Sequence, residues 1–197
     1  MEIDPKLVAR LREETGAGMM DCKKALTEAA GEFEKAKDLL RKRGVEVAAK
    51  KSGRETKNGW IGSYIHHNGR VGVMVEVLCE TDFVAKTAEF QELLKDLCMH
   101  IAMSDPIGVR REDVPQALID KEKEILKTQV PQDKPEAIQS KILQGKLDAF
   151  FKARCLLEQP FVKDPSVSIK EMIQAKIQKT GENMTFSRFA RFEIGKD

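Results

Sequence analysis

Hydrophobic residues in the first fifty positions recur at the spacing of short helices. Asp4 followed by Pro5 predicts a helix start, because aspartate is a preferred N-cap and proline suits the first helical position. After this first helix, the periodicity predicts a second helix over 21–30 and a third over 32–43. We expect the third helix to end at Gly44, since glycine best tolerates the left-handed conformation found at helix C-termini.

The period then changes to two, after a short basic segment. Residues 47–57 are small and basic with little apolar periodicity, a composition typical of a linker. Asn68 followed by Gly69 is the strongest short signal for a two-residue β-hairpin turn, and it predicts strands over 60–67 and 70–79. The second strand has one apolar face that must be buried, formed by Val71, Val73, Val75, Val77 and Cys79.

The rest of the chain predicts mostly helix, followed by a last strand. The predicted elements are a long helix over 87–105, two Lys- and Glu-rich helices over 113–129 and 135–151, a helix over 168–179, a turn over 180–183 and a strand over 184–194. One face of that strand, interrupted by Arg188, holds Met184, Phe186, Ala190, Phe192 and Ile194. Pairing this strand with the hairpin gives an α+β fold, an antiparallel sheet packed by helices, with a helical hairpin inserted at 113–151.

Composition excludes several classes of protein and partner. The chain has 197 residues and a net charge of +2, which does not by itself indicate a polyanionic partner. No apolar run is long enough to cross a bilayer, and the first residues lack the pattern of a secretion signal. Four cysteines lie far apart, without metal-ligand spacing: Cys22, Cys79, Cys98 and Cys155. Reduced thiols suit the cytoplasm, so we expect a cytoplasmic protein without a membrane partner.

The sequence contains no motif for catalysis or for binding a nucleotide. A phosphate-cradling loop is missing, and the glycines at 16–18 are not continued into a dinucleotide fingerprint. His66 and His67 are neighbours on a predicted strand, so they point to opposite faces and cannot easily share a metal ion. His100, inside the long helix, is expected to face solvent or to cap. We therefore expect no catalytic residue, cofactor, metal or directly bound nucleotide, and hence no enzyme.

The basic segment from Arg41 to Arg54 allows two interpretations. Its lysines and arginines could bind RNA phosphates with release of counterions, which would make RNA affinity steeply salt-dependent. No aromatic residue stands among these charges to stack on bases, and Glu46 and Glu55 dilute them. A solvated linker is the favoured interpretation, so direct contact with nucleic acid is not expected.

Two stretches place large apolar side chains where a loop meets a helix. Met19 and Met20 fit a hydrophobic staple or core filler as well as they fit a partner-docking surface.

Residues 81–84 lie between a strand and a helix, where Asp82 can accept backbone N–H bonds of the coming turn. From side-chain physics alone, anchoring of Phe83 inside its own fold is favoured over its insertion into a partner.

Three stretches carry a resemblance that periodicity does not show. They are LREETGAGMMDCKKAL at 11–26, ETDFVAKTAEFQELLKDLCMHIA at 80–102 and TGENMTFSRFARFE at 180–193. In this order they resemble the signature stretches of the elongation factor Ts family, and the match spans nearly the whole chain. The chain is similar to the short form of that family, which has one sheet-bearing core. Because this form tends to dimerise through its sheet, the resemblance implies a homodimer.

The resemblance also implies a domain division and a function. The N-terminal domain and its linker, at 1–54, would be a ubiquitin-associated-like three-helix domain. Residues 55–197 would form a core and dimerisation domain that contains the hairpin 113–151. The implied function is that of a non-enzymatic guanine-nucleotide exchange factor. Such a protein binds elongation factor Tu carrying GDP, displaces magnesium and promotes GDP release so that GTP can bind.

The family's partner contacts can be carried over to matching positions of this sequence. Docking on the nucleotide-binding domain of elongation factor Tu is implied for Arg12, Met19 and Met20. The loop that disturbs the partner's magnesium site, with Phe83 as its wedge and Asp82 as the polar partner of that wedge, is formed by Thr81, Asp82, Phe83 and Val84. A weaker core contact, near the partner's phosphate-binding loop, is implied for Thr180 and Gly181.

A rival function is compatible with the same residues. A ubiquitin-associated-like domain joined to an α+β dimerisation platform could serve as a general interaction module for another partner. The identity of the captured protein separates the two, since only an exchange factor would recover a GTPase of Tu size.

Overall fold

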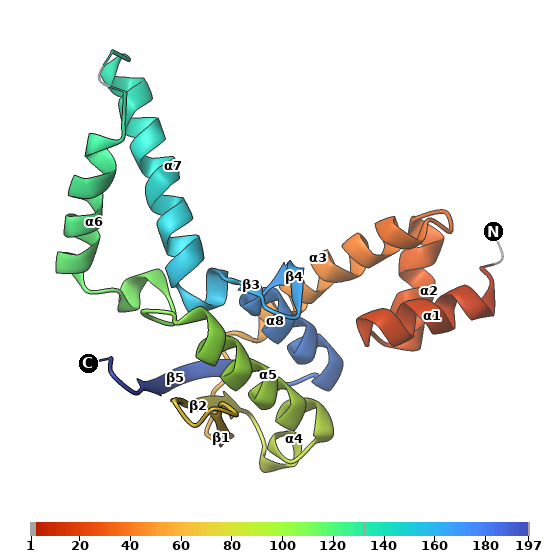
Figure 1. Cartoon of the computed structure of the whole chain (residues 1–197). Helices are drawn as coiled ribbons and strands as arrows, with labels where there is room; N and C mark the ends of the chain where they lie inside the picture. Colours follow the sequence, from red (N-terminus) through yellow and green to blue (C-terminus); the bar gives the residue numbers. More distant parts are fainter. Residues whose placement is uncertain (1–2, 132, 197) are drawn as a thin grey trace.

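The computed structural model describes residues 3–131 and 133–196; residues 1–2, 132 and 197, which fall inside the predicted domains, lie outside the described residues. Figure 1 shows an N-terminal group of helices, a central body in which helices pack on a sheet, and a helical hairpin that projects from the body. The helices are α1 (Pro5–Thr15), α2 (Met19–Glu28), α3 (Phe33–Lys51), α4 (Asp82–Ala85), α5 (Ala88–Ser104), η1 (Arg111–Asp113), α6 (Gln116–Thr128), α7 (Glu136–Arg154), η2 (Leu156–Glu158) and α8 (Ile169–Thr180). The strands are β1 (Asn58–Ile65), β2 (Val71–Cys79), β3 (Pro160–Phe161), β4 (Asp164–Ser168) and β5 (Met184–Glu193). This combination of helices with an antiparallel sheet confirms the predicted α+β class.

Helices α1, α2 and α3 pack around a small apolar core of their own. α1 begins where Asp4 Oδ1 accepts a hydrogen bond from Lys6 N at 2.9 Å, and it ends at Gly16 in the left-handed conformation. The buried side chains shared by the three helices include Val8, Leu11, Cys22, Ala25, Leu26, Ala36 and Leu40. α2 begins at Met19, before the predicted range 21–30, so the two adjacent methionines lie in its first turn.

Helix α3 does not end at Gly44 as predicted; it continues to Lys51. Gly44 is buried, and a Cβ there would lie 2.8 Å from Oε1 of Gln178 on α8. The glycine therefore marks a close approach between helices and not a helix end. Ala48, inside the predicted linker 47–57, is buried in the main core. The first part of that segment is helix, and it connects the N-terminal helices to the body.

The main sheet has the strand order β1-β2-β5, with both neighbouring pairs antiparallel, as expected for the last strand. The apolar face predicted for β2 is buried in the main core. The hairpin connection is longer than the predicted two-residue turn. His66 N donates to the carbonyl of Val71 at 2.8 Å, and Gly69 N donates to that of His66 at 2.8 Å. Gly69 supplies the expected left-handed residue with φ of 68°, but the whole segment 66–70 lies outside the strands.

A β-bulge in β5 reverses which of its side chains face the core. Glu76 of β2 pairs with Arg188, whereas the next residue of β2 pairs with Phe186, so Ser187 is the extra residue. Before the bulge, Met184 and Phe186 are buried as predicted. Beyond it, the predicted apolar face is wrong, because a shift of one residue turns every side chain to the other side. The apolar side chains turned outward within the strand are Ala190 and Phe192.

The two faces of the main sheet have different surroundings. One face packs against α5, whose buried side chains include Phe90 and Leu97, and α8 adds Ile173 to the same core. In Figure 1, α5 and α8 lie on the same side of the sheet. The opposite face carries exposed apolar side chains on all three strands, namely Ile61, Ile65, Met74 and Phe192. This outer sheet face is available for contact with another protein.

His100 is buried in the body, so the expectation of a solvent-facing or capping role was wrong. Its Nε2 lies 2.9 Å from Oε1 of Gln159, and the backbone N–H of Val162 donates to its Nδ1 at 3.3 Å. Because Nδ1 accepts a hydrogen bond, Nε2 is the nitrogen that carries the proton. The imidazole thus fastens the β3 region to α5. Burial lowers the pKa of His100, since desolvation disfavours the charged ring.

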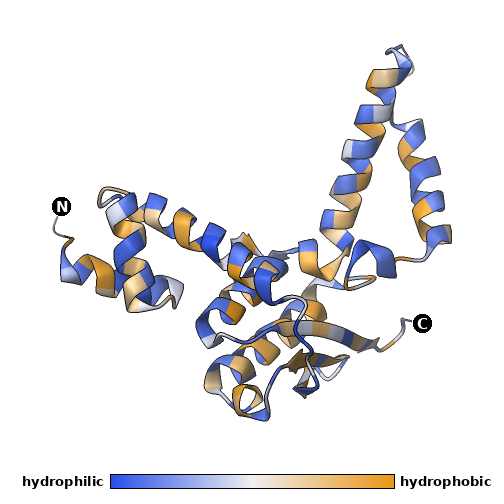
Figure 2. Ribbon diagram, turned by 180° about the vertical axis from the view of Figure 1, so that it is seen from behind, coloured by the Kyte–Doolittle hydropathy of each residue, from blue (hydrophilic) through white to orange (hydrophobic). Residues whose placement is uncertain are grey.

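Helices α6 and α7 form the helical hairpin that the sequence predicts at 113–151. The hairpin projects from the body in Figure 1, and Figure 2 shows hydrophilic residues along much of its length, mixed with hydrophobic ones. Arg111 holds its base, with two hydrogen bonds to Glu158 at 2.5 and 2.7 Å and one to Asp148 at 2.7 Å. Within 3–131 and 133–196, no helix is long and apolar enough to cross a membrane.

Candidate functional site

The short helix α4 presents an exposed aromatic ring at the end of the valine-rich strand. Phe83 is 80% exposed, so the expectation that it anchors inside its own fold was wrong. Its neighbours hold the helix in place, because Val84 packs against the main core and Ala85 is buried within it. A ring exposed to this extent contributes little burial energy to its own fold. The fold thus leaves this side chain available to another molecule.

The polar residue that caps α4 beside Phe83 is not the one expected from the sequence. Thr81, and not Asp82, is the N-cap of α4, and its Oγ1 accepts a hydrogen bond from Val84 N at 3.4 Å. Asp82 instead pairs with Lys86 Nζ at 2.7 Å on the surface. The hydrogen bond and charge of that ammonium lower the pKa of Asp82 below its ordinary value. Asp82 therefore presents an ionised carboxylate beside the exposed ring.

The turn at 180–183 lies against this loop and is bonded to it. Glu182 accepts hydrogen bonds from Thr81 N at 3.0 Å and from Thr81 Oγ1 at 2.7 Å. In the opposite direction, Glu80 accepts a hydrogen bond from Asn183 N at 2.6 Å. The structure thereby brings together the loop 81–84 and the turn at Thr180 and Gly181, two segments that the sequence analysis singled out separately.

Gly181 shapes the turn. It ends α8 in the left-handed conformation, with φ of 76°. A residue with a side chain would be strained in that conformation. Its carbonyl accepts a hydrogen bond from Lys51 Nζ at the end of α3. Thr180 Oγ1 bonds back to the carbonyl of Lys176 at 2.9 Å. The turn is therefore tied to α3 as well as to the loop that carries Phe83.

Met19 and Met20 are 46% and 64% exposed in the first turn of α2. This excludes the core-filler alternative, which requires buried side chains. Arg12 is also exposed, and it lines a hollow of about 500 Å³ together with Glu89 of α5 and Lys179 of α8. The corner between α1 and α2 thus lies beside the beginning of α5 and the end of α8. In Figure 1, this corner, the end of α8 and α4 lie toward the same lower right part of the molecule.

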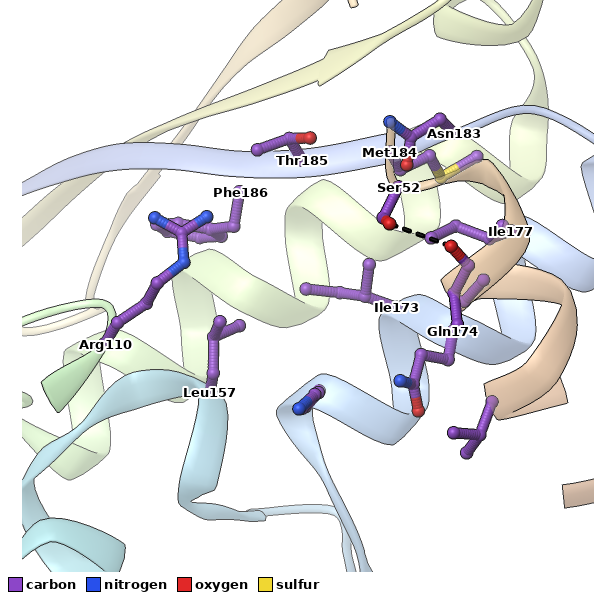
Figure 3. Close-up of a pocket in the computed structure, with 14 residues that line it drawn as sticks. Ser52, Arg110, Leu157, Ile173, Gln174, Ile177, Asn183, Met184, Thr185 and Phe186 are labelled. Carbon is purple, nitrogen blue, oxygen red and sulfur yellow. Dashed lines mark hydrogen bonds between the residues drawn. The ribbon is translucent and has the colours of Figure 1, made fainter. Parts of the chain in front are cut away.

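A second hollow, of about 530 Å³, lies between α3, α8 and the beginning of β5. Figure 3 shows Ile173 and Ile177 of α8 on one side, Phe186 on the other and Arg110 at one end. Aliphatic and amide side chains form most of its walls, and among the described residues that line it none is a carboxylate, histidine or cysteine. It therefore offers no pair of groups for acid–base chemistry. The exposed loop is the stronger candidate for a functional site.

The basic segment 41–54 is partly neutralised by carboxylates of other elements. Arg41 pairs with Glu171 at 3.2 Å, and Arg43 pairs with Glu28 at 2.6 Å. Such pairing, together with the helical structure up to residue 51, weakens the interpretation of this segment as an RNA-binding surface.

The histidines and cysteines have structural surroundings. His66 and His67 lie in the hairpin connection, not on a strand, with their ring centroids 4.2 Å apart. His66 Nδ1 is bonded to the Tyr64 hydroxyl at 3.0 Å. Across the described part of the chain, no group of three or more His, Cys, Asp or Glu could hold a metal ion. The four cysteines are free and buried, as expected for reduced core thiols.

Comparison with known proteins shows the family of this chain. A family model described as elongation factor TS matches residues 33–196. The chain belongs to the elongation factor Ts family. It is 55% identical over 197 residues to elongation factor Ts of Fervidobacterium nodosum, with 100% of both chains covered. It is 54% identical over 196 residues to elongation factor Ts of Thermotoga maritima, covering 100% of this chain and 98% of the relative. Elongation factor Ts of Alkaliphilus oremlandii is 55% identical over 197 residues, covering 100% of this chain and 91% of the relative.

Membership in the elongation factor Ts family confirms the resemblance seen in the three sequence stretches. The family model begins after the stretch 11–26, but the full-length relatives cover that part as well. Sequence reasoning missed Glu80 and Glu182, the two carboxylates that connect the loop to the turn. Thr81 and Glu182 are separated by 101 positions, and no local pattern reports a bond over such a distance.

Proposed function

We propose that this chain is the guanine-nucleotide exchange factor of elongation factor Tu. It binds elongation factor Tu carrying GDP, disturbs the bound magnesium and promotes GDP release so that GTP can bind. The observation that supports this most directly is the 80% exposure of Phe83 on an otherwise well-tethered loop. In this proposal Phe83 is the wedge, Asp82 is its polar neighbour, and Thr81 and Val84 hold the backbone that carries them.

The N-terminal helices provide a second contact in the same proposal. Met19 and Met20 are exposed side by side, and the polarisable, flexible side chain of methionine adapts well to a partner surface. Arg12 adds a cation on the adjoining helix. Thr180 and Gly181 form a weaker contact beside the wedge. The division into a ubiquitin-associated-like unit at 1–54 and a core at 55–197 belongs to this proposal.

Exchange requires differential binding and no covalent chemistry. If the factor binds nucleotide-free elongation factor Tu more tightly than the GDP form, then GDP must bind the factor complex more weakly by the same ratio. Fully burying one phenylalanine side chain is worth about 1.5–3 kcal/mol, which corresponds to about ten- to a hundredfold in an equilibrium constant. The remaining coupling must come from the rest of the interface. The chain itself then needs no bound nucleotide, membrane or nucleic acid, and it acts in the cytoplasm.

The deciding experiment measures release of fluorescent GDP from elongation factor Tu with and without this protein. We expect wild type to accelerate release and Phe83→Ala to lose most of that acceleration. A matched control is Met103→Ala, since Met103 is also a large exposed apolar residue but lies at the far end of α5. Equal release with and without wild-type protein would reject the proposed function. Recovery of a different protein and no GTPase in a pull-down would favour the general interaction module.

Removal of magnesium sharpens the same test. If the wedge acts by disturbing the ion site, then chelating magnesium removes the step that Phe83 assists. Under chelation we expect wild type and Phe83→Ala to stimulate release to nearly the same extent. If wild type and Phe83→Ala differed under chelation as much as they do with magnesium, Phe83 would not act through the ion site.

The outer sheet face supports the homodimer in this proposal. Ile61, Ile65, Met74 and Phe192 are exposed apolar side chains on the same sheet face, distributed over the three strands. Such a face is suited to association with an identical face through a two-fold axis. Sedimentation equilibrium of wild type and of Phe192→Asp tests it, with a dimer expected only for wild type. A wild-type monomer at all concentrations would contradict the homodimer without affecting the exchange proposal.

A further inference from the structure

The main sheet opens at the end where β2 leads into the Phe83 loop. Cys79 and Met184 are the last residues paired between β2 and β5 at this end. Beyond them, side-chain carboxylates replace the backbone ladder. Glu80 accepts from the backbone N–H of Asn183, and Glu182 accepts from that of Thr81. Each segment therefore satisfies a backbone donor of the other through a glutamate.

The two ends of the Phe83 loop are held by different groups. At the far end, Thr87 Oγ1 donates to the Val84 carbonyl at 2.8 Å, and Gln91 Nε2 donates to the Ala85 carbonyl at 2.7 Å. At the near end, the Glu182 carboxylate binds both the N–H and the hydroxyl of Thr81. Phe83 lies between these two tethers, and its exposed ring gains no anchorage from packing. The tethers thus fix the backbone position from which the side chain of Phe83 projects.

We infer that Glu182 is a positioning residue for nucleotide exchange, which presents Phe83 by fixing Thr81 from the neighbouring turn. This inference rests on the proposed function of the Phe83 loop. An ionised carboxylate suits the task, because both of its oxygens accept and charge-assisted hydrogen bonds are the stronger class. The Thr81 hydroxyl donates to Glu182 and accepts from Val84 N, so the bond orients the N-cap of α4.

The same contact connects two partner-facing segments. Glu182 follows Thr180 and Gly181 directly, and Lys51 holds the Gly181 carbonyl from α3. A movement of the turn would therefore displace Thr81, and with it the start of α4. The Glu182 carboxylate is the direct link between the turn and Thr81, while Glu80 adds a bond to Asn183 just before the loop.

A matched control exists within the same chain. Glu171 accepts from Ser168 N and Ser168 Oγ, both at 2.9 Å, and so forms the same two bonds that Glu182 forms to Thr81. It caps α8 at the end away from the Phe83 loop. The two bonds from Ser168 both use Oε2 of Glu171, whereas the two from Thr81 use both oxygens of Glu182, so alanine is the substitution that removes both bonds at either site. The two substitutions thus remove equivalent local bonds, but only one of them acts on Phe83.

The test is a double-mutant cycle on stimulated GDP release. We expect Glu182→Ala to slow release on the order of tenfold, the range expected for loss of charge-assisted bonds, and Glu182→Gln to slow it less. In the Phe83→Ala background, Glu182→Ala should slow release by less than about twofold, since the two residues act through one contact. Glu171→Ala should leave release near wild type, although it removes the equivalent pair of bonds to Ser168.

Amide hydrogen exchange supplies a readout that does not depend on elongation factor Tu. Glu182→Ala should accelerate hydrogen exchange at Thr81 and Val84, whereas Glu171→Ala should not. Unchanged protection there, wild-type release by Glu182→Ala, or an equal slowing in both Phe83 backgrounds would each overturn the inference. Wild-type release by Phe83→Ala would instead reject the wedge role that the proposed function gives to Phe83. The hydrogen-exchange data would still report whether Glu182 holds the loop.

Discussion

Phe83 and Phe90 lie close together in the sequence, but the fold uses them in opposite ways. Phe90, in the first part of α5, is fully buried in the main core, whereas Phe83, on α4, is 80% exposed. Both follow a threonine N-cap, Thr81 for α4 and Thr87 for α5. The local capping chemistry is thus the same in the two regions. What differs is the neighbouring structure, since α5 packs on the sheet and α4 lies at its open end.

The comparison distinguishes residues that stabilise the fold by burial from residues that stay exposed and can contact a partner. Burial of Phe90 contributes to folding, so a substitution there should appear in the unfolding free energy. Burial of Phe83 is available only in a complex, so a substitution there should appear in binding and exchange. The two quantities can be measured on the same variants, which makes the distinction directly testable.

Phe90→Ala should produce the largest effect, a loss of about 3–5 kcal/mol in unfolding free energy, because it leaves a cavity in the main core. Urea denaturation followed by circular dichroism measures it. Under conditions where the variant is folded, we expect exchange activity per folded molecule to stay close to wild type. A loss below about 1 kcal/mol would mean that the core around α5 repacks easily, and the contrast with Phe83 would fail.

Phe83→Ala should leave the unfolding free energy within about 0.5 kcal/mol of wild type, as for surface positions in general. Stimulated GDP release should fall by about ten- to a hundredfold, the range that burial of one phenylalanine can supply. Phe83→Leu keeps an apolar side chain of smaller size and should fall between wild type and alanine. If Phe83→Ala instead destabilised the fold as strongly as Phe90→Ala, the ring would be part of the folded core in solution.

The double variant Met19→Ala with Met20→Ala extends the contrast to the N-terminal helices. Both side chains are exposed, so we expect little change in stability and about tenfold weaker binding to elongation factor Tu. Most of the loss should be in the dissociation rate, since interface substitutions usually act there. Surface plasmon resonance separates the two rates. Cys22→Ala, a buried substitution on the same helix, serves as the opposite case and should change stability more than binding.

Elements with a strong local pattern were predictable from sequence. The valine face of β2 and the apolar stripe of α5 both lie in the core, because alternation and helical spacing are direct consequences of strand and helix geometry. Gly44 shows where local signals are ambiguous. A glycine after an apolar stripe can end a helix or can admit a neighbouring helix, and only the packing of α8 distinguishes the two.

The features that were missed depend on contacts distant in sequence. The bulge at Ser187 is defined by its pairing with β2, so the side-chain directions beyond it could not follow from alternation alone. The exposure of Phe83 depends on what does not cover α4, and a hydrophobic residue in a short loop carries no signal of that. The bond from Glu182 to Thr81 likewise requires the return of β5 to β2. The candidate site was found by resemblance, and its internal bonding came from the structure.

The smallest predicted effect is at His100, a buried residue of α5. It concerns the pH dependence of the unfolding free energy. The pKa of His100 in the folded state is lowered from the ordinary value of 6.5, chiefly by burial. At a pH below 6.5 the imidazole of His100 therefore binds a proton more readily in the unfolded chain than in the folded chain. The contribution of the neutral ring to the unfolding free energy is fully present above pH 6.5 and decreases as the pH falls below it. One such proton changes the unfolding free energy by at most about 1.4 kcal/mol per pH unit.

We expect urea denaturation of wild type to show this decrease between about pH 6.5 and 5.5, a range above the titration of ordinary carboxylates. The groups next to the ring in the structure, Gln159, Ser104 and Phe161, do not titrate there. His66 and His67 lie in the hairpin connection, away from the buried ring. His100→Gln should reduce the overall stability and flatten its pH dependence, whereas His67→Gln, at an exposed position, should keep the slope. A slope that survives in His100→Gln would assign the effect to other groups. Because His100 and Phe90 share α5, the result also shows whether burial in this helix stabilises the fold through polar as well as aromatic side chains.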